Sequence, residues 1–367
     1  MSTSSRARRR ATSWSYGLLA TWLALSGCGE DAAHTGDEAT DPDRPGTGNQ
    51  GDGDQPGNSG SKAGGGIPVI DAPPLHIAAN DVQSRAPMDA TPTPDGERVY
   101  YTALGIAADG SEQAGVFATD AAGGAAIETL TVGAPLTAPV GISINPEGDR
   151  LFLADSAWNA GERGAGAIVT LPTSGGAPSA LAGTEGYVPR GLVIADVSDE
   201  TWLYFTGVDP ERGEAGVFRT SLTGGTVQAV ASGAPFVDPA GVAVASDGTV
   251  YVIDALASSD ARGEASVVRV RDGAAERMIE GLGVGFPAGI ATTVDASTVL
   301  VSGLDPVSRT DRVFVVNAMN GELSVIEEPF ASFSEPAGLH RAHDTNTFAW
   351  ADSEANGKGT VYVLELK

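Results

Sequence analysis

Cysteine is almost absent from this chain of 367 residues: Cys28 is the single one. One thiol excludes an intrachain disulfide, an iron–sulfur cluster and every zinc module built on several cysteines. Basic side chains are also scarce, with 22 Lys and Arg against 47 Asp and Glu, which gives a net charge of −25. This balance opposes any general affinity for nucleic acid or for an anionic membrane surface.

Long hydrophobic runs are scarce as well, and the apolar segment Tyr16–Leu25 is too short for a transmembrane helix. Four arginines precede it within residues 6–10, so residues 1–28 are predicted to be an export signal. The signal ends in Leu25-Ser26-Gly27-Cys28, which resembles the bacterial lipobox. A stray Cys after an ordinary signal peptide is the alternative, but the order of these parts favours lipidation of Cys28. Gly29 stands where Asp would resemble an inner-membrane retention signal, which favours the outer membrane over the inner one.

Residues 29–66 contain no Val, Ile, Leu, Met, Phe, Tyr or Trp, and carry eight acids against Arg44 and Lys62. Such a segment cannot offset the entropy of folding, so a disordered acidic linker is predicted. A flexible chain of this length spans about 30 to 37 Å. The folded part is therefore expected to stand off the membrane, in the periplasm or at the cell surface.

The rest of the chain, residues 67–367, is rich in Gly and Pro and repeats internally. A five-residue phrase with Pro in second place occurs six times, and five copies have Gly in fourth place. The prolines are Pro87, Pro139, Pro189, Pro239, Pro287 and Pro336, spaced 52, 50, 50, 48 and 49 residues apart. Each phrase opens a short alternating strand, which is followed by a tight turn and a β-rich run.

A third strand and a weaker fourth follow in each unit, and four strands per 50 residues predict a six-bladed β-propeller of the all-β class. Gly in the phrase lets the innermost backbones converge. The sixth unit ends directly after its third strand. The apolar stretch that begins at Ile67 and includes Leu75-His76-Ile77 is therefore expected to supply the missing strand and close the ring.

The Pro-x-Gly phrase, the Asp-Gly hairpin and an Ala-Asp-Ser ending of the second strand resemble the NHL-repeat, gluconolactonase-like and TolB-like propeller superfamily. The resemblance covers residues 67–367. It implies the fold, and for the gluconolactonase-like members it implies a metal held by a Glu of the first inner strand with Asn and Asp further round. Here the first phrase carries Asp89 and the inner strands offer no matching Asn, which argues against lactonase activity.

Three aspartates end the second strands of the even-numbered units: Asp155, Asp254 and Asp352. Carboxylates on alternate blades suit a cation such as Ca²⁺, which is the one cofactor the sequence suggests. An Asp at a strand end more often caps a loop by accepting bonds from backbone N–H groups. Loop capping is the favoured interpretation.

Two residues break the inner ring: Asp89 replaces the ring Gly in unit one, and Arg190 precedes Gly191 in unit three. They are candidates either for contact with a ligand or for a structural pair with each other, and the pair is favoured. Trp158 and Asn159 lie in a long loop and offer an aromatic platform with polar neighbours, which suits a sugar or a peptide. The alternative interpretation of Trp158 is that its side chain only covers the blade beneath it.

No nucleophilic triad or haem motif is apparent, and whether the chain is an enzyme stays open, with a non-enzyme favoured. The favoured function is an envelope-anchored lipoprotein whose propeller is a non-catalytic binding or scaffolding module for a protein, peptide or glycan. The alternative is a metal-dependent hydrolase or lactonase of the gluconolactonase-like type. The expected membrane contact is made by the lipid on Cys28.

Replacing Cys28 by Ala should release the protein from the membrane fraction or block its processing, because this thiol is the only acyl acceptor. The measurement is the share of protein that sediments with membranes, together with incorporation of labelled palmitate. Ser26→Ala keeps a small residue before the cysteine and serves as the control. A Cys28→Ala protein that still sediments with membranes would refute the lipid anchor.

Overall fold

The computed structural model describes residues 67–71, 73–159, 165–258, 264–305, 307–308, 310–326 and 335–366. The predicted export signal with Cys28 and the predicted linker of residues 29–66 lie outside the described residues. Within the described part of the chain, no helix is long and apolar enough to cross a membrane.

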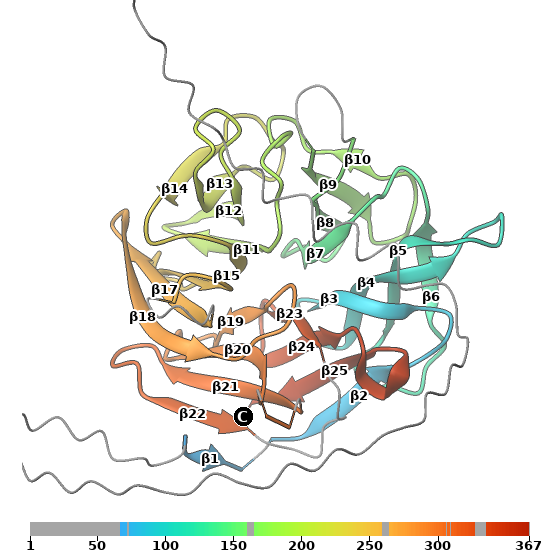
Figure 1. The fold of residues 1–367 in the computed structure, drawn as a ribbon. Helices are drawn as coiled ribbons and strands as arrows, with labels where there is room; N and C mark the ends of the chain where they lie inside the picture. The colour runs from blue at the N-terminus through green and yellow to red at the C-terminus, as the bar shows by residue number, and fades with distance from the viewer. Residues whose placement is uncertain are drawn as a thin grey trace, which may run out of the picture. The chain divides into compact units, whose positions relative to one another are not determined.

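The described strands form six sheets, which are arranged around an axis as the blades of a β-propeller (Figure 1). This confirms the predicted all-β, six-bladed fold. From the inside outward, blade 1 consists of β3 (Arg85–Pro92), β4 (Arg98–Ile106), β5 (Glu112–Asp120) and β6 (Glu128–Val132). Blade 2 consists of β7 (Pro139–Ile144), β8 (Arg150–Asp155), β9 (Ala167–Pro172) and β10 (Ser179–Ala180). Blade 3 consists of β11 (Leu192–Val197), β12 (Glu200–Val208), β13 (Ala215–Thr220) and β14 (Gln228–Ser232).

The second half of the ring repeats the same order. Blade 4 consists of β15 (Pro239–Val244), β16 (Val250–Asp254), β17 (Ala265–Arg271) and β18 (Ala274–Leu282). Blade 5 consists of β19 (Ile290–Thr292), β20 (Thr298–Leu304), β21 (Asp311–Asn317) and β22 (Leu323–Ile326). Blade 6 consists of β23 (Pro336–Arg341), β24 (Thr347–Asp352) and β25 (Thr360–Glu365), with the short 3₁₀ helix η1 (Ala355–Gly357) between the last two. Two strands precede blade 1 in the chain: β1 (Val69–Ile70) and β2 (Leu75–Ala79).

Hydrophobic side chains fill the spaces between neighbouring blades. Between blades 1 and 2, for example, Val116 of β5 belongs to the same buried cluster as Ile142 of β7 and Leu153 of β8. Each of the other five neighbouring pairs of blades, including blades 6 and 1, shares a cluster of this kind. Because a blade is covered on both faces, its second strand has a continuous apolar sequence, and all four residues from Leu151 to Ala154 are fully buried.

The inner strands meet at the axis through the glycines of the repeated phrase. A Cβ atom added to Gly141 of blade 2 would lie 2.3 Å from the carbonyl oxygen of Arg190 in blade 3. The same addition to Gly191 would lie 2.3 Å from the carbonyl oxygen of Ala240 in blade 4. Any side chain there would force the blades apart, which confirms the steric reason predicted for glycine.

The N-terminal strand β2 closes the ring. It pairs antiparallel with β25, with Leu75 opposite Leu364 and His76 opposite Val363, and it completes blade 6 as predicted. Residues from Ile67 onward were expected to contribute to the same closing segment, but β1 instead pairs parallel with β22 and adds a fifth strand to blade 5 (Figure 1). The N-terminal part of the propeller therefore contributes one strand to blade 5 and the next strand to blade 6.

Deleting β2 should lower the melting temperature of the whole propeller. The free energy of unfolding should fall by at least about 3 kcal/mol, because the deletion removes a row of ladder hydrogen bonds together with the buried methyl groups of Ala78 and Ala79. Deleting residues 67–71 should have a smaller effect, because blade 5 keeps its own four strands. Deleting residues 30–60 of the linker should leave the melting temperature unchanged. Equal melting temperatures for the intact chain and the β2 deletion would show that the ring does not depend on this strand.

Candidate functional site

The aspartates at the ends of β8, β16 and β24 are fully buried and bind the loops that lead into their own blades. The carboxylate of Asp155 accepts hydrogen bonds from the backbone N–H groups of Thr137 at 2.8 Å and Ala138 at 2.9 Å. Asp254 and Asp352 make equivalent bonds in blades 4 and 6. Burial raises the pKa of Asp155 and of Asp254, and these backbone bonds oppose that shift. The favoured interpretation, loop capping, is confirmed.

In blades 3 and 5 a buried hydroxyl group of the second strand instead connects its blade to the next one. The Thr206 hydroxyl accepts a bond from Gly191 N–H at 3.0 Å and donates to the carbonyl oxygen of Ala240 in the next blade. Ser302 likewise donates to the carbonyl oxygen of Ala337 in blade 6, at 2.6 Å. Blades 2, 4 and 6 therefore carry a capping carboxylate at the end of the second strand, whereas blades 3 and 5 carry a hydroxyl that bonds the next blade.

Asp89 occupies the axis itself, and only 2% of it is exposed. Its Oδ1 accepts a bond from Ala90 N–H, and its Oδ2 accepts one from Ile142 N–H of blade 2, both at 2.8 Å. The same Oδ2 lies 2.9 Å from Nε2 of His340, a buried residue of blade 6. A Cβ on Gly338 would lie 1.9 Å from Asp89 Oδ1, so glycine makes room for this carboxylate. The cavity that remains beside Asp89 and His340 measures about 10 Å³, about the space of one water molecule.

The predicted pair of Asp89 with Arg190 is wrong. Nη1 of Arg190 lies 2.5 Å from Oδ1 of Asp238, in the loop that enters blade 4, and its guanidinium lies over the ring of Phe286 with 5.5 Å to the centroid. The Arg190 side chain pairs with a carboxylate of the adjacent blade, whereas the carboxylate of Asp89 points into the axis and has other partners there. The true partner of Asp89 was missed, although its signal was present: His340 is an ionisable residue two positions after the ring glycine of the blade that meets blade 1.

The second histidine of blade 6 links opposite sides of the propeller. Nε2 of His343 lies 3.1 Å from Asp196 of blade 3, and its Nδ1 lies 2.7 Å from Asp344. Partial burial opposes the charged imidazolium, but the two carboxylates outweigh it and raise the pKa of His343. The two histidines of blade 6 thus have different carboxylate partners.

A cavity of about 990 Å³ lies between blades 2 and 3. It lies beside β10, the outer strand of blade 2, which has only two residues, whereas the outer strand of blade 3 has five. Loops at one end of the two blades and the strand β14 surround it. We call this cavity the blade 2–3 groove, and it is lined by Trp158, Asn159, Gly166, Ala180, Gly183, Glu185, Tyr187, Asp209, Pro210, Glu211, Arg212, Phe218, Val227 and Ala229.

Trp158 and Asn159, the ligand candidates from the sequence, both line the groove. Trp158 also packs against the hydrophobic cluster between blades 1 and 2, so it covers the core and contributes to the groove at once. Tyr187 is held edge-on against Phe205 and Phe218, with ring centroids 5.6 and 5.0 Å apart. The aromatic part of the groove is therefore anchored in the core.

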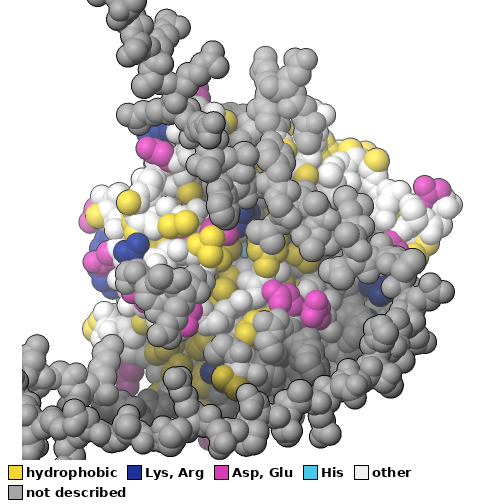
Figure 2. Space-filling view, viewed as in Figure 1, with side chains coloured by type: hydrophobic (Ala, Val, Ile, Leu, Met, Phe, Trp, Pro, Cys, Tyr) yellow, Lys and Arg dark blue, Asp and Glu magenta, His cyan; other side chains and the backbone are white. Residues whose placement is uncertain are grey.

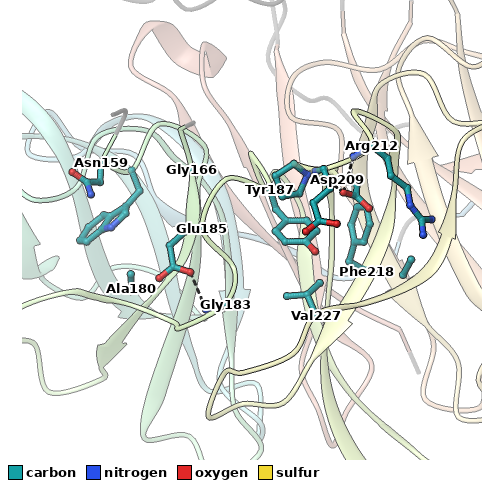
Figure 3. A pocket seen from close by; sticks show the side chains of 14 residues that line it. Asn159, Gly166, Ala180, Gly183, Glu185, Tyr187, Asp209, Arg212, Phe218 and Val227 are labelled. Atoms are coloured by element: carbon teal, nitrogen blue, oxygen red, sulfur yellow. Dashed lines mark hydrogen bonds between the residues drawn. The ribbon is translucent and has the colours of Figure 1, made fainter. Parts of the chain in front are cut away.

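Acidic side chains dominate the charged part of the groove. Glu185, Asp209 and Glu211 stand against a single base, Arg212. Figure 3 shows Asn159 and Glu185 toward one side and Arg212 at the other, with Tyr187 and Asp209 between them. Burial raises the pKa of Tyr187, and the carboxylates of Asp209 and Glu211 raise it further. Sequence reasoning missed these acids because they belong to two loops whose proximity only the ring arrangement establishes.

The residues at the axis do not fit the metal site that the gluconolactonase resemblance implies. The carboxylate of Asp89 already accepts two backbone N–H bonds and faces His340. In the ranges that the structure describes, no group of three or more His, Cys, Asp or Glu side chains is arranged to hold a metal ion. No catalytic step through a metal follows from this arrangement.

No protein-family model matches the chain, and no curated protein sequence is significantly similar to it. Among solved structures, it is similar to a putative TolB from Agrobacterium tumefaciens, with a TM-score of 0.52, 16% identity, and coverage of 77% of this chain and 90% of that one. It is similar to a putative oxidoreductase (glucose dehydrogenase) from Thermus thermophilus, with a TM-score of 0.53, 13% identity, and coverage of 80% and 100%. It is also similar to a chain of a nidogen–laminin complex, with a TM-score of 0.51, 16% identity, and coverage of 68% and 82%. The likeness is one of fold. It confirms the β-propeller architecture that the resemblance predicted.

The contact between Asp89 and His340 can be tested with a double-mutant cycle. His340→Ala should destabilise the propeller by about 2 to 4 kcal/mol, because it leaves a buried carboxylate without its partner. Asp89→Gly in the same protein should recover part of that loss, since glycine occupies this position in the other blades. The measurement is the free energy of unfolding of the single and double variants.

Arg190→Ala combined with Asp89→Gly provides the matched control, with additive effects expected because these two residues are not paired. Coupling near zero between Asp89 and His340, or clear coupling between Asp89 and Arg190, would contradict the observed pairing.

Proposed function

We propose that this chain is an envelope-anchored lipoprotein whose propeller is a non-catalytic binding module for a protein, peptide or glycan. The single observation that carries the binding role is the blade 2–3 groove, with a volume of about 990 Å³ and an aromatic and acidic lining. Its size lies at the upper end of the range for small-molecule sites, and its opening is formed by loops, where binding residues concentrate.

The anchoring part of the proposal rests on the sequence. The lipobox-like segment ends in Cys28, and the acidic linker of residues 29–66 gives a spacer between the lipid and the propeller. Gly29 favours the outer membrane over the inner one. The TolB-like fold accords with a protein of the cell envelope.

A binding role is favoured over hydrolysis by the bonding of the carboxylates nearest to the axis. Asp155, Asp254 and Asp352 accept bonds from the backbone of their own loops. Asp89 is buried and paired. A carboxylate with these partners is poorly placed to act as a general base or as a ligand to a metal.

A photoreactive amino acid at position 159 of the full-length, lipid-anchored protein should form a covalent adduct with the partner in cells, because Asn159 is exposed and lines the groove. Position 319 is the matched control: Met319 is 91% exposed and lies in the turn between β21 and β22, far from the groove in the blade order. Adducts are detected as a mass shift of the propeller on a denaturing gel. Equal adducts at both positions, or none at position 159, would argue against the groove as the binding surface.

The same preparations separate the binding role from the hydrolase alternative. A binding module should keep its melting temperature when a chelator is added. Stoichiometric metal in the purified protein, together with a melting temperature that falls on chelation, would favour the metal-dependent hydrolase.

A further inference from the structure

We propose that the blade 2–3 groove binds a basic peptide segment, with Lys or Arg side chains placed among its carboxylates and aromatic rings. This inference rests on the proposed binding function and names the chemical class of the ligand. It is carried by three features of the groove: unbalanced acidic groups, an anchored aromatic surface and a volume suited to several side chains.

The carboxylates that line the groove have oxygen atoms that are free to accept further hydrogen bonds. Oδ1 of Asp209 accepts bonds from the backbone N–H groups of Glu211 and Arg212. Within the described residues, Oδ2 of Asp209 and the carboxylate of Glu211 form no hydrogen bond or ion pair. Glu185 bonds Gly183 N–H through Oε2 alone. Three carboxylates therefore share a solvent-open cavity with acceptor capacity to spare, which suits cationic donors.

The one base of the groove does not neutralise these acids. Within the described part of the chain, the guanidinium of Arg212 makes no ion pair, and Figure 3 shows it at the far side of the groove from Glu185. The chain as a whole carries a net charge of −25. The long-range field and the local charge of the groove therefore have the same sign, and both attract a cationic partner.

The aromatic side chains give the cation a second kind of contact. Tyr187, Trp158 and Phe218 line the same cavity as the acids, and the edge-on contacts of Tyr187 hold its ring in place. An ammonium or guanidinium group is attracted to the face of such a ring. The apolar residues Ala180, Val227 and Ala229 line the same groove and suit the aliphatic stem of a Lys or Arg side chain. A neutral oligosaccharide could stack on the rings but would leave the excess negative charge uncompensated.

The test uses the full-length protein in detergent micelles and a fluorescein-labelled octapeptide of alternating Lys and Gly. Fluorescence anisotropy at about 0.15 M salt should show saturable binding, which weakens as salt is added. Octapeptides with Glu or Ser in place of Lys should not bind. Chitotetraose, measured by calorimetry, represents a neutral glycan and should bind more weakly than the Lys peptide.

Two double variants with the same change of charge decide where the peptide binds. Glu185→Gln with Glu211→Gln should weaken binding about fivefold or more, since two carboxylates near the cation are removed. Glu97→Gln with Glu322→Gln removes two exposed acids from turns at the other end of the blades, and its affinity should stay within about twofold of the parent. Tyr187→Leu should also weaken binding, about fivefold. Melting temperatures show whether each variant is folded, and the two exposed double variants decide the outcome if Tyr187→Leu unfolds.

Absence of binding by the Lys peptide, or equal weakening in the two double variants, would overturn the inference. Tighter binding of chitotetraose than of the Lys peptide would overturn it too, in favour of a glycan. These outcomes leave the proposed binding function intact, because that function fails separately, through the loss of the adduct at position 159.

Discussion

The close approach of six inner strands at the axis is the constraint on which the rest of the structure depends. At Gly141 and Gly191, for example, a carbonyl oxygen of the next blade lies 2.3 Å from the position that a Cβ would occupy. The blades can then share hydrophobic clusters on both faces, and the ring closes when β2 completes blade 6. Stability is thus distributed over six similar interfaces instead of one central core.

The one departure from glycine shows how narrow the axis is. Asp89 fits because Gly338 gives it room and because Ile142 and His340 satisfy its carboxylate. A buried carboxylate without such partners would be strongly destabilising. The cavity beside this pair measures about 10 Å³, so the axis offers little volume to a ligand, whereas the groove between blades 2 and 3 measures about 990 Å³.

The groove lies where blade 2 has its short outer strand. The two-residue strand β10 leaves space against β14, and loops from both blades surround it. A rigid ring thus supports loops that differ from blade to blade. The capping bonds of Asp155 and the bond that the Thr206 hydroxyl donates to Ala240 of blade 4 hold the neighbouring backbone in place. In the space-filling view, acidic and hydrophobic side chains lie side by side on the visible face of the described residues (Figure 2).

The sequence by itself determined the blade number, the strand order and the closing role of the segment around Leu75, but not the pairing of β1 with blade 5. This was possible because the Pro-x-Gly phrase recurs at a nearly constant interval and each blade is a local unit. It also favoured the capping role of Asp155 over a metal site, because that role depends on contacts within one blade. Only the tertiary structure decided the partners of Asp89 and Arg190. It also brought Trp158, Tyr187 and Asp209 together in one groove. These contacts join different blades, and the distance and direction between side chains on different blades depend on the twist and closure of the whole ring, which no local sequence pattern encodes.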